Sequence, residues 1–143
     1  GSEMCIRDRD RIIWHILDHA WTETEKNGEP YSLLALSPNI APIDVAILPL
    51  MEKDGMDELS MKLHLELCSL SGILSNYDAS GSIGRRYARA DEIGIPWCVT
   101  IDHQSLDDGS ATVRNRDDQQ QVRLAIDDIP ALIHDGGISA RFS

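Results

Sequence analysis

Apolar residues recur three or four positions apart in two stretches of the chain, which is typical of helices with one buried face. The first stretch covers residues 10–21, and the second covers residues 56–70 and stops before Gly72. Three short apolar runs lack this spacing and predict buried strands, at residues 43–50, 73–77 and 96–102. From residue 43 onward, predicted strands and helices therefore alternate.

The second half of the chain adds a hairpin and two short helices. Two strand-like segments flank the acidic pair Asp117 and Asp118, at residues 111–116 and 120–126. The short helices are expected over residues 85–93 and 129–134, the second of them capped by Asp127 or Asp128. Polar or Gly/Pro-rich segments predict loops and turns at residues 22–30, 37–42, 78–84 and 107–109.

This order of elements predicts the fold class. Alternating strands and helices favour parallel pairing through right-handed crossovers, and the hairpin adds antiparallel strands. We therefore expect an α/β fold, a three-layer domain with a mixed sheet of about five strands flanked by helices. The breaker cluster at residues 37–42 separates a lead-in, residues 1–40, from this domain, residues 41–143. Residues 1–9 open with Gly-Ser and look foreign to a native sequence, so they carry no weight in this prediction.

The charge balance narrows the classes of function. The 143-residue chain has 24 Asp and Glu against 13 Lys and Arg, which gives a net charge of −11 at pH 7. Such a charge opposes binding to DNA, or to RNA without regard to sequence, because that binding depends on positive charge. Two explanations of the acidity remain open, an ordinary acidic surface and a protein from a salty cytoplasm.

The cysteines, histidines and apolar runs argue against disulfide-rich, metal-binding and membrane proteins. Three widely spaced cysteines without a CxxC pair predict neither a disulfide framework nor a cysteine zinc site, which suits a reducing cytoplasm. No apolar run is long enough for a transmembrane helix and the charged start is unlike a signal peptide, so we expect no membrane partner. His15 and His19 have a zinc-like spacing but no third ligand nearby, so we expect exposed histidines and no metal.

The richest chemistry lies in residues 78–94, DASGSIGRRYARADEIG. Two glycines permit a tight loop before a helix, and the arginines that follow include Arg85 and Arg89, which share a helix face. Guanidinium groups beside the free amides of a helix start suit a phosphate or a base edge. The alternative is a solvated helix whose arginines, including Arg86, pair with carboxylates such as Asp91 and Glu92. Spacing alone does not decide between the two.

Arg114 and Arg116 alternate along one predicted strand and so share one face of the sheet. Arginines on a sheet face, with Tyr87 nearby, are suited to stack on unpaired bases and to form hydrogen bonds with them. An acidic protein can therefore still carry one local surface that faces RNA. Trp97 and Cys98, by contrast, lie in a buried-type strand and are expected in the core.

The segment SGSIGRRYARADEIGIPWCVTID, followed by TVRNRD and QVR, closely resembles the C-terminal anticodon-binding domain of glycyl-tRNA synthetases of the archaeal and eukaryotic type. LSPNIAPIDVAILPLMEKDG resembles the start of that domain, so the likeness covers roughly residues 34–134. Asn115 departs from the family, which usually has Asp at this point of the hairpin.

The lead-in resembles the end of the third sequence motif of class II synthetases. Arg11 matches the motif arginine that lies against the adenine of ATP in that family, although the residues just before it depart from the pattern. The first two class II motifs are absent. The resemblance therefore implies a fragment that does not catalyse by itself and needs no cofactor, with ATP and Mg²⁺ acting in the full-length parent.

The implied role is recognition of the anticodon stem-loop of glycine tRNA, whose unpaired bases expose their hydrogen-bonding edges. The catalytic domain of the same parent chain would attach glycine, and the family implies a cytoplasmic homodimer. Residues expected to contact tRNA lie on the arginine-rich helix and the hairpin: Arg85, Arg86, Arg89, Asp91, Glu92, Arg114 and Arg116.

Two other classes of function remain open. The same fold can serve as a non-catalytic accessory or dimerisation protein, which would bind a protein partner and ignore tRNA identity. A small phosphate-handling enzyme needs a nucleophile or base in a cleft, and His64, His103 and His134 show no triad spacing that would supply one.

Overall fold

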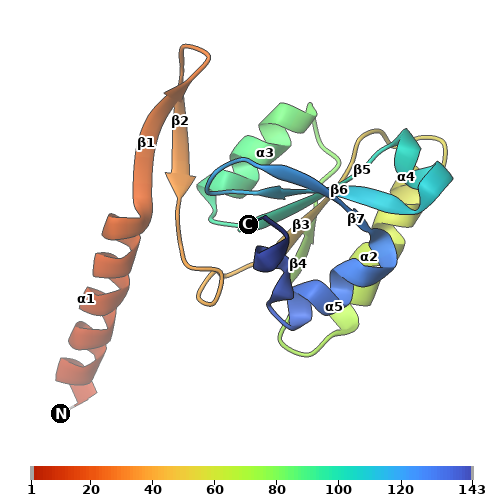
Figure 1. The fold of residues 1–143 in the computed structure, drawn as a ribbon. Coiled ribbons are helices and arrows are strands. Elements are labelled where there is room, and N and C mark those ends of the chain that lie inside the picture. Colours follow the sequence, from red (N-terminus) through yellow and green to blue (C-terminus); the bar gives the residue numbers. More distant parts are fainter. Residues whose placement is uncertain (1, 143) are drawn as a thin grey trace.

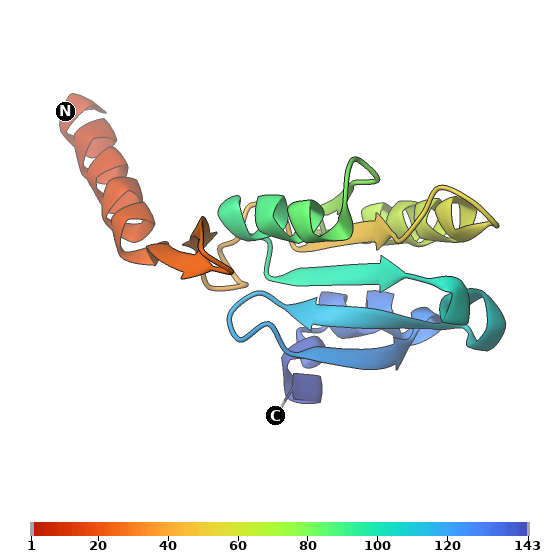
Figure 2. The same cartoon turned by 90° about the horizontal axis from the view of Figure 1, so that it is seen from above.

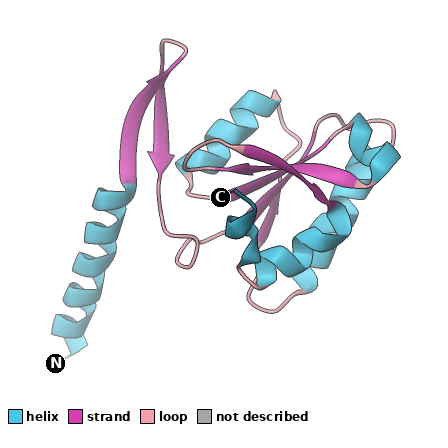
Figure 3. Ribbon diagram, in the orientation of Figure 1, coloured by secondary structure: helices cyan, strands magenta, loops and turns pink. Residues whose placement is uncertain are grey.

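The computed structural model describes residues 2–142 and centres on a five-stranded sheet with the order β4-β3-β5-β6-β7. Strands β4, β3 and β5 are parallel to one another, whereas β6 is antiparallel to both β5 and β7. The strands are β3 (Val45–Pro49), β4 (Ser75–Tyr77), β5 (Trp97–Ile101), β6 (Ser110–Asn115) and β7 (Gln121–Ala125), shown in magenta in Figure 3. The predicted mixed sheet is confirmed.

Helices cover both faces of this sheet (Figure 1). On one face lie α2 (Met56–Ser69), η1 (Ile126–Asp128), α5 (Ile129–His134) and η2 (Gly137–Phe142), and on the other lies α3 (Ile83–Glu92). Side chains alternate along β3, so that Val45 and Ile47 join the core with α2 while Ala46 and Leu48 join the core with α3. The predicted three-layer α/β arrangement is therefore confirmed.

Residues 107 and 108, predicted as part of a turn, belong instead to the end of a short helix, α4 (His103–Asp108), and Gly109 caps it. A capping box begins this helix, because the Asp102 carboxylate accepts from the Ser105 amide while the Ser105 hydroxyl accepts from the Asp102 amide. The segment HQSLDD has no apolar periodicity, so its helix depends on the cap and on the left-handed Gly109 that ends it.

The lead-in forms a long helix and a hairpin that project from the rest of the molecule (Figure 2). Helix α1 (Ser2–Ala20) begins earlier than expected, and β1 (Trp21–Lys26) pairs with β2 (Glu29–Leu34). The prediction of a loop over residues 22–30 is therefore wrong. Asn27 and Gly28 have φ values of 55° and 82°, as a two-residue type I′ hairpin turn requires.

The apolar side of α1 is open to solvent. Trp14 is 71% exposed and Ile12 60% exposed, although the helical spacing of apolar residues predicts a buried face there. Within residues 2–142, every helix is too short or too polar to cross a membrane.

Candidate nucleic-acid interface

The loop between β4 and α3 is held by two arginines of the helix that follows it. The carbonyl of Gly81 accepts from Nε of Arg86 at 3.1 Å and from Nη2 at 2.8 Å, and Arg86 also donates to the carbonyl of Pro49. Arg89 donates to the Asp78 carboxylate through Nε at 3.0 Å and Nη2 at 2.6 Å. The loop therefore has a fixed shape at the point where the parallel strands end.

Arg86 and Arg89 differ in how many N–H donors they leave free for a ligand. Arg86 is only 5% exposed, and its donors are spent on main-chain carbonyls. The Arg89 side chain is 46% exposed, and its Nη1 atom makes no hydrogen bond with any described residue. Burial raises the pKa of Asp78, but hydrogen bonds from the Ser80 amide and from Arg89 outweigh burial and lower it. Asp78 thus stays charged and orients Arg89.

The exposed side of α3 carries Arg85, Arg89 and Glu92, so the spacing argument for Arg85 and Arg89 is confirmed. Arg85 and Glu92 form no hydrogen bond or ion pair with another residue in the part of the chain that the structure describes. The Arg85 guanidinium and Nη1 of Arg89 therefore offer N–H donors, and the Glu92 carboxylate offers acceptors, to a ligand that approaches α3.

The opposite side of α3 holds a buried ion pair. Asp91 accepts from Nη1 of Arg114 at 2.9 Å and from Nη2 at 2.8 Å, and the two side chains are 0% and 3% exposed. Burial alone would lower the pKa of Arg114, but the hydrogen bonds to Asp91 raise it, so the guanidinium stays charged. The Tyr87 ring lies 4.8 Å from Cζ of Arg114 and adds a cation–π contact.

The same ion pair anchors the lead-in. The Tyr31 hydroxyl on β2 donates to the Asp91 carboxylate, and burial together with this carboxylate raises the pKa of Tyr31 to about 12. Arg116 donates to the carbonyls of Gly94 and Leu36, at 2.9 and 2.5 Å. Buried polar contacts thus join the hairpin, α3 and the sheet. The domain boundary expected near residue 41 stays a prediction.

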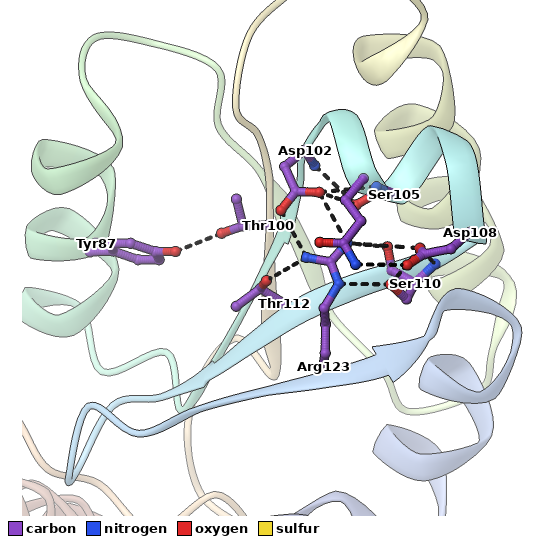
Figure 4. Close-up of polar contacts among 9 residues, drawn as sticks. Tyr87, Thr100, Asp102, Ser105, Asp108, Ser110, Thr112 and Arg123 are labelled. Atoms are coloured by element: carbon purple, nitrogen blue, oxygen red, sulfur yellow. Dashed lines mark hydrogen bonds and ion pairs between the residues drawn. The ribbon is translucent and has the colours of Figure 1, made fainter.

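Another arginine, Arg123, forms a network of polar contacts where β5 ends (Figure 4). Arg123 on β7 donates to both oxygens of Asp102, at 2.9 and 3.1 Å, and also to the Ser110 and Thr112 hydroxyls. The hydrogen bonds from Arg123, followed by those from Ser105, lower the pKa of Asp102 to about 2. A hydrogen bond from the Ser110 hydroxyl lowers the pKa of Asp108 as well.

Sequence reasoning did not single out Arg123 or Asp102. Arg123 lies opposite Thr112 in the β6–β7 register, and Asp102 directly follows β5. A strand-order prediction combined with this hairpin register would have placed Arg123 two strands away from β5, with Thr112 of β6 between them. That was the available signal.

The expected tRNA-contacting residues therefore fall into two groups. Arg85, Arg89 and Glu92 are exposed on α3. The other four are buried and bonded within the protein: Arg86, Asp91, Arg114 and Arg116. Arg114 lies on β6, but Arg116 directly follows the strand and lies in the turn, so the two do not alternate along one strand as expected. Arg114 is bonded to Asp91 of α3, and Arg116 is bonded to the carbonyls of Gly94 and Leu36, so neither is open for base stacking. Trp97 and Cys98 are in the core, as expected, and burial raises the pKa of the Cys98 thiol to about 12.

Arg11 is exposed on α1. This helix projects away from the sheet and from α3 (Figure 1). The structure therefore does not bring the expected ATP contact and the expected tRNA contacts into one site.

Comparison with known proteins identifies the domain. Residues 44–135 match the family model described as an anticodon binding domain. The chain belongs to this anticodon-binding domain family. The matched range contains all of α3 and the whole five-stranded sheet, and with them both the exposed and the buried arginines.

Relatives of the domain are glycine–tRNA ligases. The chain is 47% identical over 126 residues to the ligase of Methanothrix thermoacetophila, which is 88% of this chain and 22% of that protein. It is 41% identical over 124 residues to the ligase of Archaeoglobus fulgidus, which is 87% of this chain and 22% of the relative. The chain thus spans about 22% of the length of these relatives. Residues 44–143 could supply only 100 of the 126 aligned residues, so the likeness extends into the lead-in.

A solved structure supports the fold. The chain superposes on the crystal structure of prolyl-tRNA synthetase from Cryptosporidium parvum complexed with L-proline and AMP, with a TM-score of 0.62. The match covers 71% of this chain and 23% of that chain at 20% sequence identity, and it shows the shared fold.

Proposed function

We propose that this chain is the anticodon-binding part of a glycine–tRNA ligase and that it holds the anticodon stem-loop of glycine tRNA. The 47% identity to a glycine–tRNA ligase over 88% of the chain carries the proposal. The exposed side of α3 supports it, because Arg85, Arg89 and Glu92 offer unpaired polar groups on an acidic protein. Unpaired loop bases are where RNA sequence is read.

The two groups of residues have different roles in this proposal. Arg85, Arg89 and Glu92 contact the RNA directly. Arg86, Asp91, Arg114 and Arg116 act as positioning residues, because their buried bonds fix the loop before α3 and hold the helix on the sheet. Correct placement of the anticodon end would then orient the distant acceptor end of the tRNA for glycine transfer.

The rest of the parent ligase supplies the chemistry in this proposal. ATP and Mg²⁺ act there, in the cytoplasm, and Arg11 is the one residue of this chain assigned to ATP. The exposed apolar side of α1 supports a neighbour that covers it, since patches of this kind are normally buried by a partner. The parent is proposed to be a homodimer, and the present chain by itself activates no glycine.

The proposal is tested by titrating the full chain with the anticodon stem-loop of glycine tRNA, and with versions whose anticodon bases are substituted, at low and high salt. Substitution of the anticodon is expected to weaken binding clearly at both salt concentrations. Arg85→Gln should weaken binding too. The matched control Arg141→Gln removes the same charge from η2 on the opposite face and should leave binding unchanged.

Two results would contradict the proposal. Equal binding of all stem-loops that vanishes as salt rises would mean backbone electrostatics alone. No binding to any stem-loop would favour a non-catalytic accessory protein of the same fold.

A further inference from the structure

A cavity of about 530 Å³ lies where the parallel strands β3 and β5 begin, on the face of the sheet that α5 and η2 cover. Five segments that are far apart in the sequence meet here, at residues 38–39, 44, 72–73, 96–97 and 133–139. No residue of α3 lines it, so the cavity is separate from the surface proposed to contact RNA. Its volume is typical of a small-ligand site.

One side of the cavity is apolar and contains an indole N–H group without a partner. Ile73, Ile133 and Ile138 lie there together with Trp97, the first residue of β5. Trp97 is only 6% exposed, and its N–H donates to no described residue. This N–H is not fully enclosed, because Ser60 Oγ is the one fully buried and unpartnered side-chain N or O atom among the described residues. Since Trp97 is otherwise buried, the cavity that it lines is where its N–H can donate to a ligand.

The other side of the cavity carries negative charge that the protein leaves available. Asp44, directly before β3, accepts from the Leu74 amide through Oδ2 at 2.8 Å, and its Oδ1 accepts from no described residue. Asp135, directly after α5, lies 3.1 Å from Nδ1 of His134 through Oδ1, and its Oδ2 has no partner within the described part of the chain. None of the described residues that line the cavity is Lys or Arg. The cavity therefore suits a ligand that brings its own positive charge.

We propose that this cavity binds an arginine side chain from the part of the parent ligase that lies outside this chain, an assignment that rests on the function proposed above. A guanidinium is planar, always charged and surrounded by N–H donors, so one group can serve both carboxylates. The methylene stem of the arginine packs on the isoleucines of the apolar side. The indole N–H of Trp97 donates to the main-chain carbonyl of the same arginine.

Other ligand classes match the cavity less well. A phosphate or carboxylate would be repelled by Asp44 and Asp135. An apolar ligand would remove water from both carboxylates without pairing them, which costs free energy. A lysine ammonium is a compact and strongly hydrated charge that lacks the planar fork of donors.

The position of the cavity favours the parent ligase as the source of the arginine. The chain spans about 22% of the length of its relatives, so most of such a ligase lies outside it. Pro38 and Asn39 on the cavity wall belong to the segment that joins the lead-in to β3. A domain attached through the lead-in is tethered beside the cavity, which raises the effective concentration of its side chains there.

The test adds N-acetylarginine amide to the full chain with ¹⁵N-labelled tryptophan. The indole N–H resonance of Trp97 should shift until it saturates, whereas those of Trp14 and Trp21 on the lead-in should stay in place. Asp44→Asn should weaken binding about tenfold, because it removes a hydrogen bond between charged groups while its amide oxygen still accepts from the Leu74 amide. Asp107→Asn, on the exposed side of α4, makes the same charge change away from the cavity and should leave binding unchanged.

Two further probes test the chemistry of the ligand. N-acetylcitrulline amide has a similar shape without the charge and should cause no saturable shift. Equal binding of the citrulline probe would overturn the role of charge, and equal binding of Nα-acetyllysine amide would overturn the choice of a guanidinium. A Trp97 resonance that no probe moves would overturn the site itself.

The full-length ligase tests the source of the arginine. Its Trp97 resonance should lie at the arginine-bound position before any addition and should not respond to N-acetylarginine amide. A response would overturn the assignment to the parent ligase. None of these readouts uses RNA, so failure of the stem-loop titration together with a saturable arginine shift would overturn the proposed RNA binding and leave the cavity site in place.

Discussion

Arg114 and Asp91 form the most deeply buried ion pair that the structure describes, and each depends on the other for its charge. Asp91→Asn leaves the Arg114 guanidinium in place without a counter-charge. We expect a loss of about 3–5 kcal/mol in the free energy of unfolding, the usual cost of breaking a buried pair from one side. Urea unfolding followed by tryptophan fluorescence measures it.

Asp117→Asn is the matched control for this prediction. Asp117 also pairs with an arginine, Arg116, but its side chain is 54% exposed. The Arg116 side chain is buried, but it keeps its hydrogen bonds to the Gly94 and Leu36 carbonyls, and water screens the exposed Asp117 carboxylate. We therefore expect a loss of about 1 kcal/mol or less. Equal losses for the two variants would mean that burial of the Arg114 pair adds nothing to its effect on stability.

The lowered pKa of Asp102 predicts that the free energy of unfolding falls at acid pH. Hydrogen bonds from Arg123 lower its pKa from 3.8 to about 2, so the folded state favours the carboxylate. The resulting stabilisation, about 1–2 kcal/mol, is present above pH 4 and is lost as the pH falls towards 2. Arg123→Gln should return the pKa of Asp102 towards 3.8, measured by NMR titration of its carboxyl carbon. The stability gap to the unchanged protein should close over the same pH range, and a gap that persists at pH 2 would contradict the assignment.

At the residue scale, the sequence shows which side chains carry charge but not which of them are paired. Arg85 and Arg86 are adjacent, and periodicity correctly separates their faces, yet nothing local reveals that Arg86 bonds to Pro49 across the fold. The pairing of Asp91 with Arg114 likewise joins residues that lie far apart in the chain. Four of the seven residues expected to contact RNA are buried, and the sequence does not reveal it because their partners are distant in the chain.

At the scale of elements, Gly94 follows α3 and lies against the end of β2. Its φ is +85°, and a Cβ there would lie 3.2 Å from the Leu34 carbonyl oxygen and 3.3 Å from Cδ1 of Leu36. Gly94→Ala should therefore add steric overlap to backbone strain and loosen the hairpin. Hydrogen exchange at residues 31–36 should rise, and the free energy of unfolding should fall by about 1–3 kcal/mol beyond the strain alone.

Gly81→Ala isolates the strain in this comparison. Gly81 has a similar φ of +77°, but a Cβ there would meet nothing within 4 Å. It should cost about 1 kcal/mol and leave exchange in the hairpin unchanged. If the two variants lose equal stability, the contact between Gly94 and the hairpin segment is not tight.

The elements themselves were predictable where one face is apolar. The stripe along α2 shows the helical period because one face is buried, and β6 and β7 are predicted as two strand-like segments that flank the turn residues Asp117 and Asp118. The β1–β2 hairpin was missed because its first strand, WTETEK, is exposed throughout and shows no apolar alternation. Its Asn27–Gly28 turn is a strong hairpin signal in the sequence, but a polar segment conceals it among loop residues.

At the scale of the whole molecule, four of the six arginines in residues 44–135 are unavailable to a ligand. Arg86, Arg114 and Arg116 are buried, and Arg123 donates to Asp102 and its neighbours. The surface that RNA meets therefore combines a net charge of −11 with a few exposed arginines on α3. Binding must depend on short-range hydrogen bonds more than on long-range attraction.

The salt dependence of RNA binding follows from this charge distribution. For single-stranded RNA, log K falls with log salt with a slope of about −0.7 for each phosphate that the protein neutralises. Arg85 and Arg89 together neutralise about two phosphates at most, so the slope should be no steeper than about −1.5. Screening of the repulsion between the acidic surface and the RNA should make it shallower still. Titration of the anticodon stem-loop over a range of KCl concentrations measures the slope. Arg85→Gln should reduce it further, whereas a slope steeper than about −4 would require several more exposed cations than α3 carries.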